Sequence, residues 1–153
     1  MADNATAIRC MQLPLVDMSL LVPNSAVAEI IGYTPPEVPG EGPDWYDGKI
    51  SWRGAMVPVV SLEKMCQSAS VEPGPRTRIA VVYDINGASD MPYFGIILRD
   101  IPRAYLAEEE RLIDQNLAAG CQYLATQADA MIDDLYIPNL DAILASLHQE
   151  VPA

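Results

Sequence analysis

The side chains that could carry out chemistry are few, and they form no catalytic arrangement. The chain has one histidine, His148, close to its C-terminal end, so a histidine-based acid, base or nucleophile pair is not expected. The acidic runs Glu108–Glu110 and Asp133–Asp134 could supply paired carboxylates, but neighbouring acids usually form a solvated surface. No phosphate-binding glycine loop, nucleophile elbow or zinc-binding helix motif occurs. We therefore predict no catalytic residue, no enzymatic activity and no small-molecule substrate.

Metal and cofactor sites are not indicated either. Cys10, Cys66 and Cys121 are odd in number, widely separated and without a CxxC motif. This pattern excludes a recognisable zinc cluster and a fully paired disulfide framework. The acids between residues 129 and 134 lack the alternate spacing and central glycine of a calcium loop. We expect buried free thiols in a reducing compartment, no metal and no cofactor.

The charge of the chain limits its partners. Its 153 residues carry a net charge of −12, and residues 84–153 hold most of it. Nucleic acid and anionic membrane surfaces both attract basic proteins, so neither is expected as a partner. No stretch approaches the roughly 18 apolar residues of a spanning helix, and no basic-then-apolar signal segment begins the chain. We predict a cytoplasmic protein with no direct membrane insertion.

The elements that must position any site are mainly strands. Thirteen prolines favour short strands and turns over a helical bundle. Apolar, alternating or β-branched runs predict strands, and the most secure pair is the hairpin of 79–83 and 93–98, whose connection begins with the turn signal Asn86-Gly87. The predicted strands are 8–13, 19–22, 48–60 with a turn at Gly54, 79–83, 93–98, 103–106, 122–131 and 135–138.

Three short helices and two loops complete the prediction. Ser25, Ser61 and Asp141 are expected to cap short helices that end near residues 31, 65 and 147. Residues 32–48 and 67–77 are rich in proline and glycine and predict loops. Pro58 suggests that its strand lies at a sheet edge, and Gly95 indicates a bulge or a close backbone approach.

One pattern occurs twice, 80 residues apart. Val57-Pro58, Val60 and the cap Ser61 are mirrored by Ile137-Pro138, Leu140 and the cap Asp141. This repeat suggests two related halves, each made of a few strands followed by a short helix.

Four segments in order resemble the CheW-like domain family. The clearest is GKISWRGAMVPVVSLEKM at residues 48–65, with a hydrophobic-x-Arg-Gly turn, a proline-containing strand and a short helix. The other three are Ala28–Ile31, the paired runs 79–83 and 94–98, and Ile137–Asp141. The resemblance covers about residues 8–147, which we take as one domain between a flexible N-terminus (1–7) and a frayed C-terminus (148–153).

The resemblance implies an all-β fold of two intertwined five-stranded SH3-like barrels with a hydrophobic seam between them and a short C-terminal helix. It also implies a non-enzymatic adaptor that couples the cytoplasmic tips of chemoreceptors to the regulatory domain of a chemotaxis-type histidine kinase. The proline-rich loop is more similar to the accessory adaptors of pilus-linked (twitching) systems than to the main flagellar adaptor.

The same resemblance places Arg53 and Gly54 on a turn that faces the partner and pairs Arg53 with Glu29. Arginine's planar fork can hold a carboxylate with two prongs and fix such a turn, although a surface salt bridge with no binding role is the competing interpretation. Trp52 is either an interface anchor or, because it alternates with Ile50, a core residue. Trp45, with Tyr46, is expected to offer an exposed aromatic contact from the loop.

Two departures from the family pattern bear on the partner. The family commonly has Asn-Leu-Arg-Gly at the turn, where this chain has Ser51–Gly54, and Arg99 occupies the place of a usual acidic residue. Two other functions therefore stay open. One is a β-barrel module that binds a peptide or pilus-assembly component by strand addition, and the other is a hydrolase that uses the acidic runs.

Overall fold

The computed structural model describes residues 7–37, 41–67, 72–84, 92–108, 121–127 and 135–150. These ranges contain strands, one 3-10 turn and two helices, so the mainly β prediction is confirmed. In chain order the elements are β1 (Ala7–Pro14), β2 (Ser19–Pro23), η1 (Asn24–Ala26), β3 (Val27–Gly32), β4 (Tyr46–Trp52), β5 (Ala55–Val60), α1 (Leu62–Met65), β6 (Arg78–Tyr83), β7 (Tyr93–Leu98), β8 (Arg103–Glu108), β9 (Leu124–Gln127), β10 (Leu135–Pro138) and α2 (Leu140–Glu150).

The strands form two five-stranded sheets. The first sheet has the order β8-β1-β2-β10-β9, and the second sheet has the order β3-β6-β7-β5-β4. Each sheet has one parallel pair, β2 with β10 and β5 with β7, and its other pairs are antiparallel. Pairing among the described strands leaves both sheets open at their ends, so the expected five-stranded units are present there without a continuous ring of paired strands.

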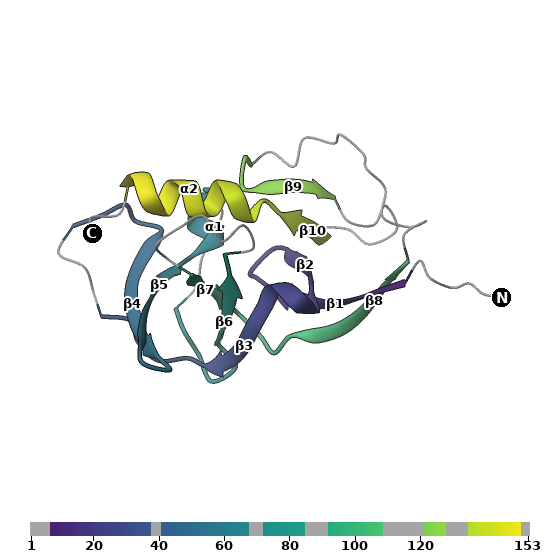
Figure 1. Ribbon diagram of the computed structural model, residues 1–153, viewed down its shortest axis with the longest axis horizontal. Coiled ribbons are helices and arrows are strands. Elements are labelled where there is room, and N and C mark those ends of the chain that lie inside the picture. The colour runs from purple at the N-terminus through teal and green to yellow at the C-terminus, as the bar shows by residue number, and fades with distance from the viewer. Residues whose placement is uncertain are drawn as a thin grey trace.

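The two sheets are intertwined and topologically equivalent. The first sheet combines β1 and β2 with β8–β10 from the other end of the chain, and the second sheet uses the strands between them. Replacing β1, β2, β8, β9 and β10 by β6, β7, β3, β4 and β5 converts one strand order into the other, parallel pair included. The repeated segments lie at equivalent places, because β5 leads into α1 as β10 leads into α2 (Figure 1). The prediction of two related halves is confirmed.

A shared hydrophobic core joins the two sheets, and we call it the seam core. It contains buried residues of β1 and β2, of β6 and β7, and of both helices. Phe94, Leu13 and Leu20 are among its largest fully buried side chains. The helix α2, which is yellow in Figure 1, contributes Ile143, Leu144 and Leu147 from one side. Neither sheet buries its apolar face without the other.

Each sheet also has an inner core on its opposite face. The inner core of the second sheet contains Ile50, Trp52, Val57, Val59, Ile79, Val81 and Ile97, whereas that of the first sheet contains Cys10, Leu21 and Leu135. Because β6 and β7 are buried on both faces, their sequences are nearly continuous apolar runs. Gly95 of β7 makes room for neighbouring side chains and not for the close backbone approach expected, since a Cβ there would lie 3.0 Å from Ile79 Cγ2 and 3.3 Å from Val59 Cγ2, and its pairing with β6 has no bulge.

Two local predictions are wrong. Residues 27–31, expected to be helical, form β3, which pairs along β6, so only Asn24–Ala26 makes a helical turn. Pro58 was expected on an edge strand, but β5 lies between β4 and β7. The proline is tolerated because the pairing of β5 with β7 covers Val59 and Val60 only.

The helix caps agree in part with the sequence. Ser61 Oγ accepts a hydrogen bond from Lys64 N at 3.5 Å, as predicted. For α2 the cap is Asn139, whose Oδ1 accepts from Ala142 N at 3.1 Å, so Asp141 lies in the first turn instead. The helix continues to Glu150, three residues beyond its expected end at 147.

The cysteines differ from the expectation of free thiols. Cys66, just after α1, and Cys121, just before β9, form a disulfide with their Cα atoms 5.3 Å apart. Cys10 is free and buried, as predicted, and burial raises the pKa of its thiol. Since α1 follows the second sheet and β9 belongs to the first, the disulfide links the two units across the seam.

Candidate interaction site

The turn between β4 and β5 presents an arginine in a constrained backbone conformation. Trp52 and Ala55 pair across the turn, and the two residues between them have positive φ angles of 48° at Arg53 and 78° at Gly54. Two consecutive left-handed residues are typical of the tight hairpin turns whose twist matches that of the strands. Glycine adopts this angle freely, whereas Arg53 does so at a cost of about 1 kcal/mol. The turn predicted at Gly54 is therefore present.

The side chain of Arg53 is held in place by two contacts. Its Nη2 lies 2.7 Å from Glu29 Oε1, and its guanidinium carbon lies 5.0 Å from the centre of the Trp52 ring. The Arg53 side chain is 70% exposed and that of Glu29 is 38% exposed. An ion pair so exposed contributes little to stability, and a guanidinium over an indole adds about 0.5–1 kcal/mol. The pair predicted between Arg53 and Glu29 is present, and it fixes the direction of an exposed cation.

This ion pair also joins the two edges of the second sheet. Glu29 lies on edge strand β3, and Arg53 follows edge strand β4. Further along, Glu37 and Lys49 exchange backbone hydrogen bonds of 2.8 and 3.3 Å in an isolated antiparallel bridge. Gly48 permits this bridge, because a Cβ at its φ of 119° would lie 2.0 Å from the carbonyl oxygen of Glu37. The two contacts draw the open sides of the sheet together around its inner core.

Trp52 is a core residue and not an exposed anchor. It is 8% exposed, belongs to the inner core of the second sheet and packs edge-on against Tyr93 with ring centres 4.9 Å apart. Its Nε1 has no hydrogen-bond partner within the part of the chain that the structure describes. Of the two interpretations, burial is the one observed, and Trp52 reaches the site only as the ring beneath Arg53.

Trp45 does not offer an exposed aromatic contact, so that prediction is wrong. It is 7% exposed, as is Tyr46, and both pack in the seam core. The carbonyl of Trp45 accepts a hydrogen bond of 2.9 Å from Ser61 N, which fixes the entrance to β4 beside α1. The exposed apolar residue next to the turn is instead Met56, which is 53% exposed and lies opposite Ser51. Because β5 is a continuous apolar run, its sequence gives no sign that Met56 is the exposed residue.

A buried ion pair at the boundary between the two units was not predicted. Glu63 is fully buried, and its Oε2 lies 2.9 Å from Nε of Arg99. Val16 N donates to the same carboxylate oxygen at 3.1 Å, and Ser61 Oγ donates to the other at 3.2 Å. Because Arg99 N also donates to Pro14 O at 2.9 Å, this network ties α1 and the end of β7 to the first sheet. All bonding sites named here are satisfied internally, which indicates a structural role.

The described residues offer no catalytic or metal-binding arrangement. His148 lies exposed in the last turn of α2. Within the described ranges there is no group of three or more histidine, cysteine or acidic side chains suited to a metal, and no helix is long and apolar enough to cross a membrane. The acids Asp133–Asp134 and most of the run 108–110 lie outside the described residues. What the site offers is an exposed, oriented charge on a rigid turn.

Comparison with known proteins agrees with this architecture. The profile of the CheW-like domain matches residues 9–120. The crystal structure of the scaffolding protein TtCheW from Thermoanaerobacter tengcongensis superposes with a TM-score of 0.74 at 17% sequence identity, over 86% of this chain and 88% of that one. No curated protein sequence matches the chain significantly. With a family profile that covers most of the chain and the same fold in that structure, the chain belongs to the CheW-like domain family.

Proposed function

We propose that the chain is a non-enzymatic adaptor in a bacterial chemosensory array. It couples the cytoplasmic tips of chemoreceptors to the regulatory domain of a chemotaxis-type histidine kinase. The observation that carries this proposal is the turn at Arg53 and Gly54, where an exposed guanidinium is held 2.7 Å from Glu29 above the buried ring of Trp52. Membership of the CheW-like family supports it.

The adaptor works by holding two partners together. A preoriented arginine loses little conformational freedom on binding and can meet a carboxylate with two parallel hydrogen bonds. Met56 adds an exposed apolar contact beside it. A modest interface with an apolar centre and a polar rim suffices when several partners are joined, because effective concentration multiplies weak affinities.

The cellular setting follows from the same proposal. A partner of both receptor tips and a kinase acts in the cytoplasm, and the net charge of −12 favours protein partners over nucleic acid. The array drives flagellar or pilus-linked (twitching) motility, and the similarity of the proline-rich segment between residues 32 and 48 to the accessory adaptors favours the second. The neighbouring genes, or proteins that copurify with the chain, identify the kinase to be used as the probe.

The decisive test is capture of the kinase regulatory domain by charge-reversal variants. Arg53→Glu places a second acid beside Glu29, so we expect capture to weaken at least about tenfold. Arg76→Glu is a matched control, because Arg76 also lies 2.7 Å from an acid, Asp100, with side-chain exposures of 65% and 43%. If both variants capture the kinase domain as well as wild type, the assigned face is wrong.

One observation favours a second candidate, peptide binding by strand addition. Among the described strands, the edge strand β8 pairs only with β1, and its Leu106 is 62% exposed. An added strand would bond to the free edge of β8 and cover Leu106. Under this alternative Leu106→Lys abolishes capture of the partner and Arg53→Glu does not, and under the adaptor proposal through Arg53 the reverse holds.

A further inference from the structure

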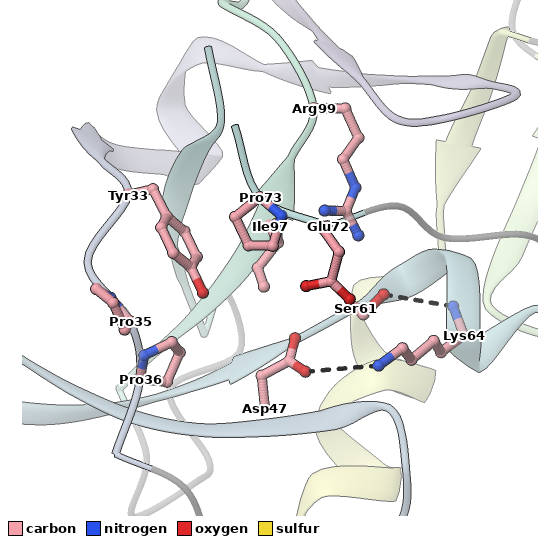
Figure 2. Close-up of a pocket in the computed structure, with 10 residues that line it drawn as sticks. All are labelled: Tyr33, Pro35, Pro36, Asp47, Ser61, Lys64, Glu72, Pro73, Ile97 and Arg99. Atoms are coloured by element: carbon pink, nitrogen blue, oxygen red, sulfur yellow. Dashed lines mark hydrogen bonds and ion pairs between the residues drawn. The ribbon is translucent and has the colours of Figure 1, made fainter. Parts of the chain in front are cut away.

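A pocket opens at the opposite end of β4 from the Arg53 turn. It has a volume of about 310 Å³ and lies between the segment after β3, the start of β4, α1 and the end of β7. Figure 2 shows Asp47 and Lys64 near its floor, Tyr33 at one side and Arg99 at the other. The volume equals that of about ten water molecules in the liquid, which is room for one long side chain.

Two carboxylates in this pocket lack a strong partner. The carboxylates of Asp47 and Glu72 point into the same space (Figure 2). Lys64 Nζ lies 4.0 Å from Asp47 Oδ1, which is too long for a hydrogen bond. Arg99 is already bonded to the buried Glu63. Among the described residues, no side chain donates a hydrogen bond to either pocket carboxylate.

The charge balance of the pocket is negative. Asp47, Glu72 and the adjacent Glu63 carry three negative charges, whereas Lys64 and Arg99 carry two positive ones. Burial raises the pKa of Asp47, and the attraction of Lys64 and Arg99 offsets this only in part. The burial of Tyr33 itself raises the pKa of its hydroxyl, and the charge of Asp47 adds to that effect. The carboxylate of Asp47 is partly desolvated and poorly paired, so it gains from a cation that enters beside it, whereas Glu72 is exposed and can meet the same cation from the rim of the pocket.

The walls of the pocket match a flat cation. Tyr33, Pro35, Pro36 and Pro73 line it with ring surfaces beside the two carboxylates. A guanidinium is planar, stacks on rings and presents several N–H donors, so it can meet two carboxylates at once. A lysine ammonium is more strongly hydrated and concentrates its charge at one point, so it fits this lining less well.

We propose that this pocket receives an arginine side chain projected by a protein partner, with its guanidinium bound between Asp47 and Glu72. The net charge of −12 makes a basic partner segment the complementary one. This contact goes beyond the adaptor function proposed above and uses none of the residues at the Arg53 turn. It gives the second sheet a docking point at each end of β4.

The test is titration of the full chain with N-acetylarginine amide, followed by the backbone amide NMR signals of Asp47, Lys64 and Arg99. A single side chain should bind with a Kd on the order of 10 mM. Asp47→Asn should weaken binding at least about tenfold and Glu72→Gln several-fold, since each removes an acceptor for the guanidinium. Lys64→Met should strengthen binding about threefold, because the ammonium no longer competes for Asp47. Asp17→Asn, a change at an exposed acid outside the pocket, should leave binding unchanged.

Three results would overturn the proposal. The first is no shift of these signals with the arginine probe in either wild type or Lys64→Met. The second is equal affinity of Asp47→Asn and Asp17→Asn for the probe. The third is binding of inorganic phosphate or N-acetylglutamate amide that Lys64→Met abolishes, which would show an anion site. None of these measurements involves the kinase, so they are independent of the capture test with Arg53→Glu.

Discussion

Glu63 is a fully buried acid, and acidic side chains are rarely fully buried in proteins. A fully buried carboxylate loses several kcal/mol of hydration, which must be recovered from its partners. Arg99, Val16 N and Ser61 Oγ together supply a charge-assisted bond and two further hydrogen bonds. Because these groups come from different segments, the network favours one relative placement of the two sheets over others.

Removing Arg99 should therefore be costly. We expect Arg99→Met to lower the free energy of unfolding by about 3 kcal/mol, because it leaves the charge of Glu63 buried without its cation. Urea denaturation measures this change. Arg76→Met removes an exposed arginine and should cost less than about 1 kcal/mol. Equal effects of the two substitutions would contradict a structural role for the buried pair.

Asp47 should make stability depend on pH in the opposite sense to most acids. Burial raises its pKa above the ordinary 3.8, so the folded protein binds this proton more tightly than the unfolded chain. As the pH rises from below 3.8 through the raised pKa, the carboxyl of Asp47 loses its proton and the free energy of unfolding decreases. We expect Asp47→Asn to be more stable than wild type at pH 7, and the difference to fade as the pH falls below 3.8, in urea denaturation at each pH. A constant difference across this range would show another cause.

For individual residues, the sequence predicts turns and ion pairs near in sequence or known from the family better than it predicts which side chains are buried. The turn at Arg53 and Gly54 has a recognisable pattern, and the partner Glu29 follows from the family resemblance. Trp45 was wrongly predicted to be exposed because the residues around it in the sequence are rich in proline and glycine. In the structure its carbonyl accepts a hydrogen bond from Ser61 N, 16 positions away, and its side chain packs in the seam core. Glu63 was missed because a short helix with one acid gives no sign that an arginine 36 residues later will cover it.

Among the elements, the hairpin β6–β7 was the most predictable and β3 the least. A run such as Val27–Ile31 fits one helical turn as well as a strand, and its pairing with β6 decides the outcome. Pro58 was assigned to an edge because local reasoning cannot show where along β5 the pairing with β7 begins. In both cases a contact distant in sequence overrides the local preference.

Closure of the second sheet depends on Gly48. Gly48→Ala would place a methyl group against the backbone of Glu37 and break its bridge to Lys49, so we expect a loss of at least about 2 kcal/mol in unfolding free energy. Gly54→Ala is the control, since no atom lies within 4 Å of its Cβ position and only the strain of its positive φ remains, about 1 kcal/mol. Urea denaturation of both variants compares their losses of unfolding free energy, and the excess at Gly48 measures the crowding against Glu37. A smaller loss in Gly48→Ala than in Gly54→Ala would contradict the role of Gly48 in closing the second sheet.

The disulfide between Cys66 and Cys121 should stabilise the join between α1 and β9. It closes a loop with a sequence separation of 55, for which chain entropy predicts about 4 kcal/mol. We expect dithiothreitol to lower the urea midpoint of wild type and to leave that of Cys66→Ser unchanged. Alkylation of free thiols in intact cells then shows whether Cys66 and Cys121 are disulfide-bonded there, since a reducing cytoplasm disfavours disulfides. Equal midpoints of wild type with and without the reductant would contradict the expected stabilisation.

The whole molecule should not divide at its middle. A cut between residues 67 and 72 leaves β1 and β2 without β8–β10, and β3–β5 without β6 and β7. We expect fragments 1–70 and 71–153 to lack a cooperative urea transition alone, because each lacks strands of both sheets and part of the seam core. Mixed together, they should recover the strand signal in circular dichroism. A cooperative transition of either fragment alone would contradict this.

The matching order of the two sheets has a consequence for ancestry. A peptide of half this length, with two strands, then three strands and a helix, could complete such a sheet only by exchanging strands with an identical copy. Duplication and fusion of its gene would place both copies in one chain. The exchange of strands would then be intramolecular, and the sequences of the two copies could differ.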